Sequence, residues 1–191
     1  MQLGRNELKM ISYIVKKSKI HGSGLFANKD FEKGELIFEV DLSKLPRIQS
    51  NTKPSKENEL HIDYVGRGKY VVSHHPYVYI NHSCDPNILV KHETIAKSKF
   101  YAMKNISKDE QFTYDYGVNA MDQIDKELWK TKCECGSKNC RGILSTSFLK
   151  QPINIQKKYY KYLPPSIKRE YKDKFEKLIE KVVSAKKAKI M

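Results

Sequence analysis

Long apolar runs are missing from this sequence, and that absence already excludes several classes of protein. No stretch approaches the roughly 18 apolar residues of a transmembrane helix, and the N-terminus has no apolar signal-peptide region. We therefore expect a soluble, intracellular chain without membrane contact, nuclear or cytoplasmic, and leave delivery into a host cell open. Heptads and internal repeats are also absent, which excludes a coiled coil and a solenoid. A hydrophobic fraction of 39% excludes a wholly disordered chain.

Acidic residues are few, with 22 Asp and Glu against 36 Lys and Arg, which gives a net charge of +14. The imbalance is concentrated at the end of the chain. Residues 150–191 hold 13 basic and 4 acidic residues, a net charge of +9, so the first 149 residues contribute only +5. A basic tail favours polyanionic partners such as DNA, RNA or a nucleoprotein. A solvated helix face without a partner explains the charge equally well.

Most of the chain has the pattern of short strands separated by turns. Apolar runs alternate with glycine turns between residues 13 and 40, and further runs cover 60–65, 69–73, 77–80, 87–90, 99–103 and 111–114. Residues 43–59 are polar and contain two prolines, which predicts a loop inside an insert at about 43–69. The fold class expected is mainly β, of the α+β type.

Helical patterns appear only toward the end of the chain. Residues 120–130 predict a short helix, within a linker at 120–132. A Pro-Pro-Ser sequence at 164–166 then starts an apolar stripe with intervals of three and four residues, extending to Val183. This stripe predicts an amphipathic helix of about five turns. We expect it to pack on the rest of the protein, with a partner surface as the less favoured interpretation.

Three of the four cysteines lie within eight residues, at Cys133, Cys135 and Cys140. With Cys84 they would complete a four-thiolate zinc site, which we favour for a chain without an export signal. Two disulfides, or one disulfide and two free thiols, are the alternatives. His82 as the fourth ligand is a weaker variant.

Three other segments have residues suited to binding or catalysis. Asn81–Asn87 places small polar side chains after an apolar run, where they form either a hydrogen-bonded turn or contacts to an adenine or a carboxylate. Tyr114 and Tyr116 point to the same face of a strand, as channel-lining dipoles, as acid–base groups, or simply as packing. The sequence His21-Gly22-Ser23-Gly24 allows a close backbone approach to a ligand.

Taken in order, these pieces resemble the SET-domain family of protein lysine methyltransferases. Gly22–Ala27 with Glu32–Glu35 resembles the family's opening motif, and Asn81–Asn87 its Asn-His-Ser-Cys-x-Pro-Asn motif. Glu110–Gly117 is similar to the closing tyrosine strand, and Cys133–Gly142 to the zinc knuckle called post-SET. The resemblance covers about residues 12–145.

The resemblance implies a fold of several small sheets in which the Asn81 segment threads through a loop. It divides the chain into an N-terminal segment (1–12), the SET domain (13–119), the linker, the knuckle (133–146) and a basic helical extension (147–191). It implies S-adenosylmethionine as cofactor and one structural zinc ion. The cofactor-binding residues would be His21, Gly22, Ser23, Gly24, Asn81, His82 and Tyr116. Tyr116 would be the catalytic tyrosine, Tyr114 would limit the number of methyl groups, and Cys84, Cys133, Cys135 and Cys140 would bind zinc.

The implied activity is methylation of a lysine in a protein substrate, such as a histone or another basic nucleic-acid-associated protein. Tyr114 favours mono- or dimethylation, because its hydroxyl occupies space that a methylated amine needs. The alternatives are a catalytically silent SET-fold binding module and a zinc-stapled nucleic-acid-binding protein. Val40 stands where many members have a channel tyrosine, and Tyr64, Tyr70 or Tyr79 could replace it. The sequence leaves the target lysine and the oligomeric state open.

Overall fold

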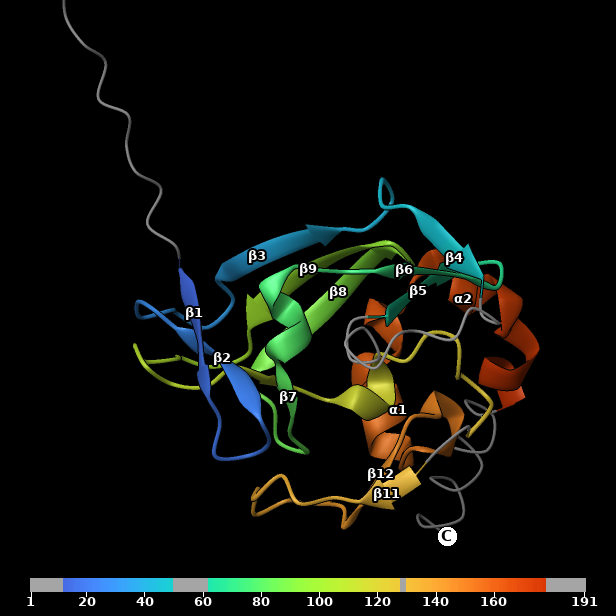
Figure 1. The fold of residues 1–191 in the computed structure, drawn as a ribbon. Helices are drawn as coiled ribbons and strands as arrows, with labels where there is room; N and C mark the ends of the chain where they lie inside the picture. The colour runs from blue at the N-terminus through green and yellow to red at the C-terminus, as the bar shows by residue number, and fades with distance from the viewer. Residues whose placement is uncertain (1–11, 50–61, 128–129, 178–191) are drawn as a thin grey trace, which may run out of the picture.

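Short strands in small sheets are the main regular elements of the computed structural model, which describes residues 12–49, 62–127 and 130–177 (Figure 1). The first strands are β1 (Tyr13–Lys17), β2 (Ser23–Ala27), β3 (Leu36–Asp41), β4 (Arg47–Gln49), β5 (Ile62–Gly66) and β6 (Lys69–Val72). They are followed by β7 (Asn81–His82), β8 (Ile88–Thr94), β9 (Lys97–Ala102), β10 (Thr113–Tyr114), β11 (Lys130–Lys132) and β12 (Ile143–Ser145). The predicted class, mainly β with a few helices, is confirmed.

The antiparallel sheet β3–β9–β8 forms the centre of the main core. Alternation along β3 buries Phe38 and Val40 and leaves Glu39 in solvent. Ile37 is buried as well, at an irregularity of the strand between Leu36 and Phe38. Phe38 stacks on Phe100 of β9 with ring centroids 4.6 Å apart. The sheet therefore has one apolar face, and the strands β1 and β2 and the segment before β7 pack toward the same core.

The strands β7 and β10 pair in parallel although about 30 residues separate them in the sequence. Asn81 lies opposite Thr113, and His82 lies opposite Tyr114. The side chain of Asn87 reinforces this pairing, because its Oδ1 accepts from the backbone N–H of Thr113 at 2.8 Å. Two motifs from separate parts of the sequence thus form one local unit. Threading of the Asn81 segment through a loop stays a prediction.

The C-terminal extension packs against the segment that follows β10, through α1 (Ile153–Tyr159), α2 (Pro165–Glu170) and a further helical stretch at 172–177 (Figure 1). Together they form a second core of Val118, Met121, Ile124, Phe148, Tyr159, Leu163, Ile167 and Phe175. The expected packing of the apolar stripe on the protein is confirmed. The expected single helix is not, because α2 ends at Glu170 and the helix resumes at 172. Residues 178–183 of that stripe lie outside the described part.

Three other local predictions were wrong. The expected helix at 120–132 is not formed. Residues 120–127 form turns and bends that bury Met121 and Ile124 in the second core, and the chain from Lys130 to Lys132 is strand β11. Residues 128–129 lie outside the described part. Residues 77–80 are not a strand, because the 3-10 helix η2 (Pro76–Tyr79) is capped by the His75 ring, which accepts from the Tyr77 N–H. Strand β4 lies inside the predicted loop at 43–59. Within the described residues, no helix is both long and apolar enough to cross a membrane.

Candidate functional site

A cavity of about 480 Å³ opens beside the tyrosine pair. Strands β3, β5, β6, β8 and β9 and the turns after β10 supply its walls. Its aromatic and acidic lining residues are Tyr64, Tyr70, Tyr77, Tyr114, Tyr116, Phe100, Asp63 and Asp122. No Lys or Arg lines it among the described residues, although the protein carries a net charge of +14. The cavity is therefore an acidic and aromatic site in a basic protein.

Tyr114 and Tyr116 lie side by side at this cavity, with ring centroids 5.0 Å apart. The phenol of Tyr116 donates a hydrogen bond to the carbonyl of Ile80 at 2.9 Å, which fixes the direction of the ring. Burial raises the pKa of Tyr116 to about 12, and burial also raises the pKa of Tyr114. Both phenols are therefore neutral near pH 7 and present O–H dipoles to their surroundings.

The glycine segment and Asn81 contact each other outside the cavity. The Asn81 amide donates to the backbone carbonyl of Ser23 at 2.8 Å. A Cβ at Gly24 would lie 2.6 Å from the side-chain nitrogen of Gln111, so a larger residue there would have to displace that side chain. Neither the glycine segment nor Asn81 lines the cavity.

Tyr116 contacts both regions. Its ring is 5.4 Å from that of His82, and it also lines the cavity. His21 lies in the exposed turn before Gly22, at the edge of the glycine segment. The structure therefore brings the glycine, Asn-His and tyrosine motifs together around one residue.

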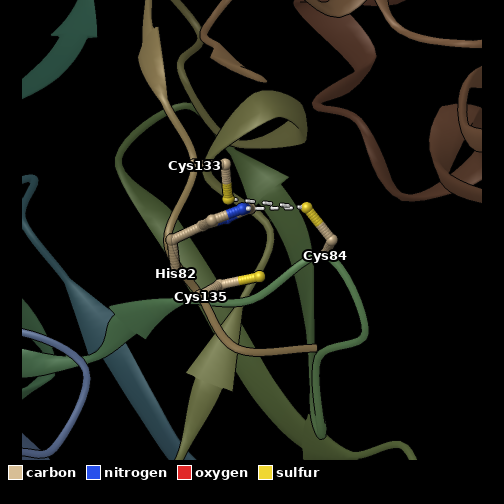
Figure 2. A group of neighbouring side chains, drawn as sticks. All are labelled: His82, Cys84, Cys133 and Cys135. Carbon is tan, nitrogen blue, oxygen red and sulfur yellow. Dashed lines mark hydrogen bonds between the residues drawn. The ribbon is translucent and has the colours of Figure 1, made fainter. Parts of the chain in front are cut away.

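The four cysteines are free thiols and belong to one cluster. Figure 2 shows three of them, Cys84, Cys133 and Cys135, around the His82 ring. Ligand atoms of His82, Cys84, Cys133 and Cys135 all lie within 4.8 Å of one another. The Cys84 and Cys133 sulfurs are 3.8 Å apart. Two sulfurs bound to one tetrahedral zinc ion at about 2.3 Å are also about 3.8 Å apart. The donor set therefore fits zinc in both chemistry and spacing, and it leaves no disulfide.

His82 and Cys140 compete for the fourth position of this cluster. The His82 Nδ1 accepts from the backbone N–H of Tyr116 at 3.2 Å, so in the neutral ring Nε2 carries the proton. That Nε2 lies 3.3 Å from the Cys84 sulfur, to which it donates in this tautomer. Cys140 packs on the same cluster, with its sulfur 3.5 Å from the Cys133 carbonyl oxygen. The ligand atoms that lie within 4.8 Å of one another include that of His82 and not that of Cys140, so Cys140 as the fourth ligand stays a prediction.

A buried ion pair joins the knuckle to the tyrosine segment. The Arg141 guanidinium contacts both carboxylate oxygens of Asp115 at 2.7 Å, and Asp115 is 1% exposed. The Arg141 guanidinium is thus bound to the residue between Tyr114 and Tyr116.

Several residues of the site were missed by the sequence interpretation. Of the proposed substitutes for the tyrosine absent at Val40, Tyr64 and Tyr70 line the cavity and Tyr79 does not. Tyr77, which was not considered, also lines it and donates to Asp63. No local signal could have revealed Tyr77, because its direction depends on the 3-10 helix. Asp115 was also missed, although a carboxylate between two tyrosines in the sequence indicates a buried acid that needs a partner.

The fold and the site define a class of protein, a β-rich domain in which three motifs meet around Tyr116 beside a thiol cluster. The SET-domain family matches residues 22–117, half of the chain. The chain belongs to the SET-domain family.

Curated relatives include histone-lysine N-methyltransferase trithorax of Drosophila virilis, 33% identical over 146 residues that cover 68% of this chain and 4% of that protein. Histone-lysine N-methyltransferase set-2 of Caenorhabditis elegans is 31% identical over 159 residues, covering 73% and 10%. The chain thus spans no more than a tenth of either relative. A solved structure, a humanized mutant of the Chaetomium thermophilum Polycomb Repressive Complex 2 bound to the inhibitor GSK126, is 29% identical. That similarity has a TM-score of 0.45 and covers 56% of this chain and 15% of that chain.

Proposed function

We propose that this protein is an S-adenosylmethionine-dependent protein-lysine N-methyltransferase. The observation that carries the proposal is that Tyr116 both contacts the Asn-His segment and lines the aromatic cavity. A cofactor held by that segment and a substrate in the cavity would then meet at the same residue. The family membership supports the same activity, since the relatives above are named as histone-lysine N-methyltransferases.

The cofactor side would be formed by the glycine segment and by β7. His21, Gly22, Ser23 and Gly24 offer backbone contacts, and Asn81 and His82 complete the site beside Tyr116. S-adenosylmethionine, when bound, supplies an electrophilic methyl group. The missing side chain at Gly24 leaves room for Gln111, which any Cβ there would displace.

The substrate lysine would enter through the cavity. Burial in an aromatic cavity lowers the pKa of an amine, so the ammonium group can release its proton to water. The Tyr116 hydroxyl donates its proton to the Ile80 carbonyl, so the phenol oxygen can accept a hydrogen bond from the neutral amine. That hydrogen bond would orient the lone pair of the amine nitrogen. Tyr114 would limit the space for methyl groups, and we propose mono- or dimethylation.

Zinc would be held by Cys84, Cys133, Cys135 and Cys140, with His82 donating a hydrogen bond to the Cys84 sulfur. The ion would supply folding energy and not chemistry, because the hairpin β11–β12 and its loop bury little apolar surface of their own.

The cavity favours a basic protein as the substrate. Asp63 and Asp122 are the charged residues among its described lining, and both are acidic. Carboxylates beside the entering lysine favour flanking Lys or Arg in the substrate, as in a histone tail, and disfavour acidic flanks. A histone substrate would place the protein in the nucleus.

The lysines of the extension provide a second surface, which we propose as a nucleic acid contact. Lys158 lies over the ring of Tyr159 and Lys161 over that of Tyr162, at 5.1 and 4.9 Å. Both lysines are exposed. They could contact phosphates while the helices α1 and α2 hold the extension on the second core.

The test is methyl transfer from tritiated S-adenosylmethionine to core histones and to a total lysate, comparing wild type with Tyr116→Phe. The expected result is label on discrete bands, reduced at least 100-fold by the substitution while cofactor binding remains. Tyr101→Phe is a matched control, because Tyr101 lies in β9 and does not line the cavity. Mass spectra of the product should show mono- or dimethyl lysine.

Unchanged turnover in Tyr116→Phe would remove Tyr116 from its role, and a mainly trimethylated product would contradict the role of Tyr114. Cofactor binding without any transfer would favour a catalytically silent binding module.

A further inference from the structure

The carboxylate of Asp115 organises the turn that carries Tyr116. Its Oδ1 accepts from the backbone N–H of Gly117 at 3.0 Å, which caps the 3-10 helix η3 (Tyr116–Val118). Its backbone carbonyl accepts from the Asn119 side chain at 2.9 Å. Asp115 is 1% exposed, so its charge must be balanced within the protein.

Arg141 supplies that balance, and it is held at both ends. Its two terminal nitrogens each lie 2.7 Å from a carboxylate oxygen of Asp115, which is the geometry of a bidentate pair. Its backbone N–H points to the Cys84 sulfur at 3.4 Å, and in the sequence it directly follows Cys140. When the knuckle folds so that its thiols lie together, it therefore also determines the position of the Arg141 guanidinium.

His82 does not replace Arg141 as the partner. Its Nδ1 lies 3.8 Å from Asp115 but already accepts the Tyr116 N–H, so the ring is neutral in this arrangement. Among the described residues, Asp115 thus has one permanently charged partner, and that partner belongs to the knuckle.

We propose that Arg141 is a positioning residue that couples metal loading of the cysteine knuckle to the placement of Tyr116. When the thiol cluster is loaded, the knuckle holds the guanidinium on Asp115 and the turn of Tyr116 is fixed. When the knuckle is released, Asp115 is a buried carboxylate without its partner, and the segment 113–119 loosens. The consequence for turnover rests on the proposed function, whereas the coupling itself does not.

The test compares Arg141→Gln, Asp115→Asn and the double variant with wild type, all with the four cysteines intact. Lys138→Gln is a matched control, because Lys138 is an exposed cation of the same knuckle. Three quantities are measured on the metal-loaded proteins: bound zinc per chain, amide hydrogen exchange of 113–119, and kcat and KM for a histone substrate.

We expect Arg141→Gln to keep its zinc but to lose at least tenfold in exchange protection of 113–119 and at least tenfold in kcat. Chelation should cause the same loss of protection in wild type and no further loss in Arg141→Gln. The double variant should recover protection relative to either single variant, because a neutral amide pair leaves no buried charge. Arg141→Lys should recover part of it.

Wild-type protection in Arg141→Gln would overturn the proposal. Loss of zinc from that variant would overturn it as well, because Arg141 would then stabilise the knuckle itself. Exchange and zinc content need no turnover, so a protein that shows the coupling without methyl transfer would refute the proposed function alone. Methyl transfer without the coupling would refute this inference alone.

Discussion

Replacement of Phe175 by alanine tests whether the C-terminal extension is part of the folded domain. Phe175 is 2% exposed and lies edge-on to Phe148 and Tyr160, with centroid distances of 5.9 and 4.8 Å. Truncation of a buried phenylalanine costs about 3–5 kcal/mol. We expect about 3 kcal/mol, because the end of an extension can partly close the cavity. With a urea m-value of about 2 kcal/mol/M, the unfolding midpoint would fall by about 1.5 M.

The assay is urea unfolding followed by circular dichroism at a helical and at an aromatic wavelength. Both signals should move together, since the second core also contains Met121 and Ile124 from the chain after Tyr116. Lys172→Ala is the control, because this exposed lysine has only a surface ion pair with Glu176 and should change stability by less than about 0.5 kcal/mol. If only the helical signal shifted, the extension would be an independent appendage and the reasoning would be refuted.

Three further results are expected. Chelation of zinc should abolish methyl transfer at a chelator concentration that leaves the circular dichroism of the domain intact; full activity after verified zinc removal would contradict this. Burial lowers the pKa of His92 to about 4, so the folded protein keeps its ring neutral and stability falls as the pH decreases from 6.5 to 4. The loss, up to about 3 kcal/mol, should disappear in His92→Gln, and equal pH slopes in urea unfolding would refute it. Asp122→Asn should lower kcat/KM several-fold for a peptide with basic flanks but not for one with neutral flanks, and an equal effect on both peptides would remove Asp122 from substrate selection.

The sequence was sufficient to identify the site motifs, because each is a run of adjacent residues with side chains of fixed chemistry. The glycine turn, the Asn81 segment, the tyrosine strand and the clustered cysteines all meet in the structure. The nucleic acid contact should be tested by substitution of exposed lysines such as Lys158 and Lys161, because deletion of residues 150–191 would remove Ile167 and Phe175 from the second core.

Residues whose direction depends on distant packing could not be predicted in this way. Asp63 and Tyr77 form a hydrogen bond across 14 residues, and Tyr77 reaches the cavity only because Pro76 starts a 3-10 helix. A strand over 77–80 would have given its side chains alternating directions. The apolar pattern at 120–130 was misread because tertiary packing, and not helical periodicity, buries Met121 and Ile124.

The placement of Tyr116 requires more than the pairing of strands. Strand β10 has two residues, which is too short to hold a side chain precisely by its ladder alone. Side chains from three other parts of the protein supply the rest. The His82 ring accepts the Tyr116 N–H, and Arg141 fixes the turn through Asp115. Gln151, near the start of the extension, packs closely against this turn, because a Cβ at Gly117 would lie only 2.6 Å from its side chain. Changes in the knuckle or in the extension should therefore affect turnover without any contact to the substrate.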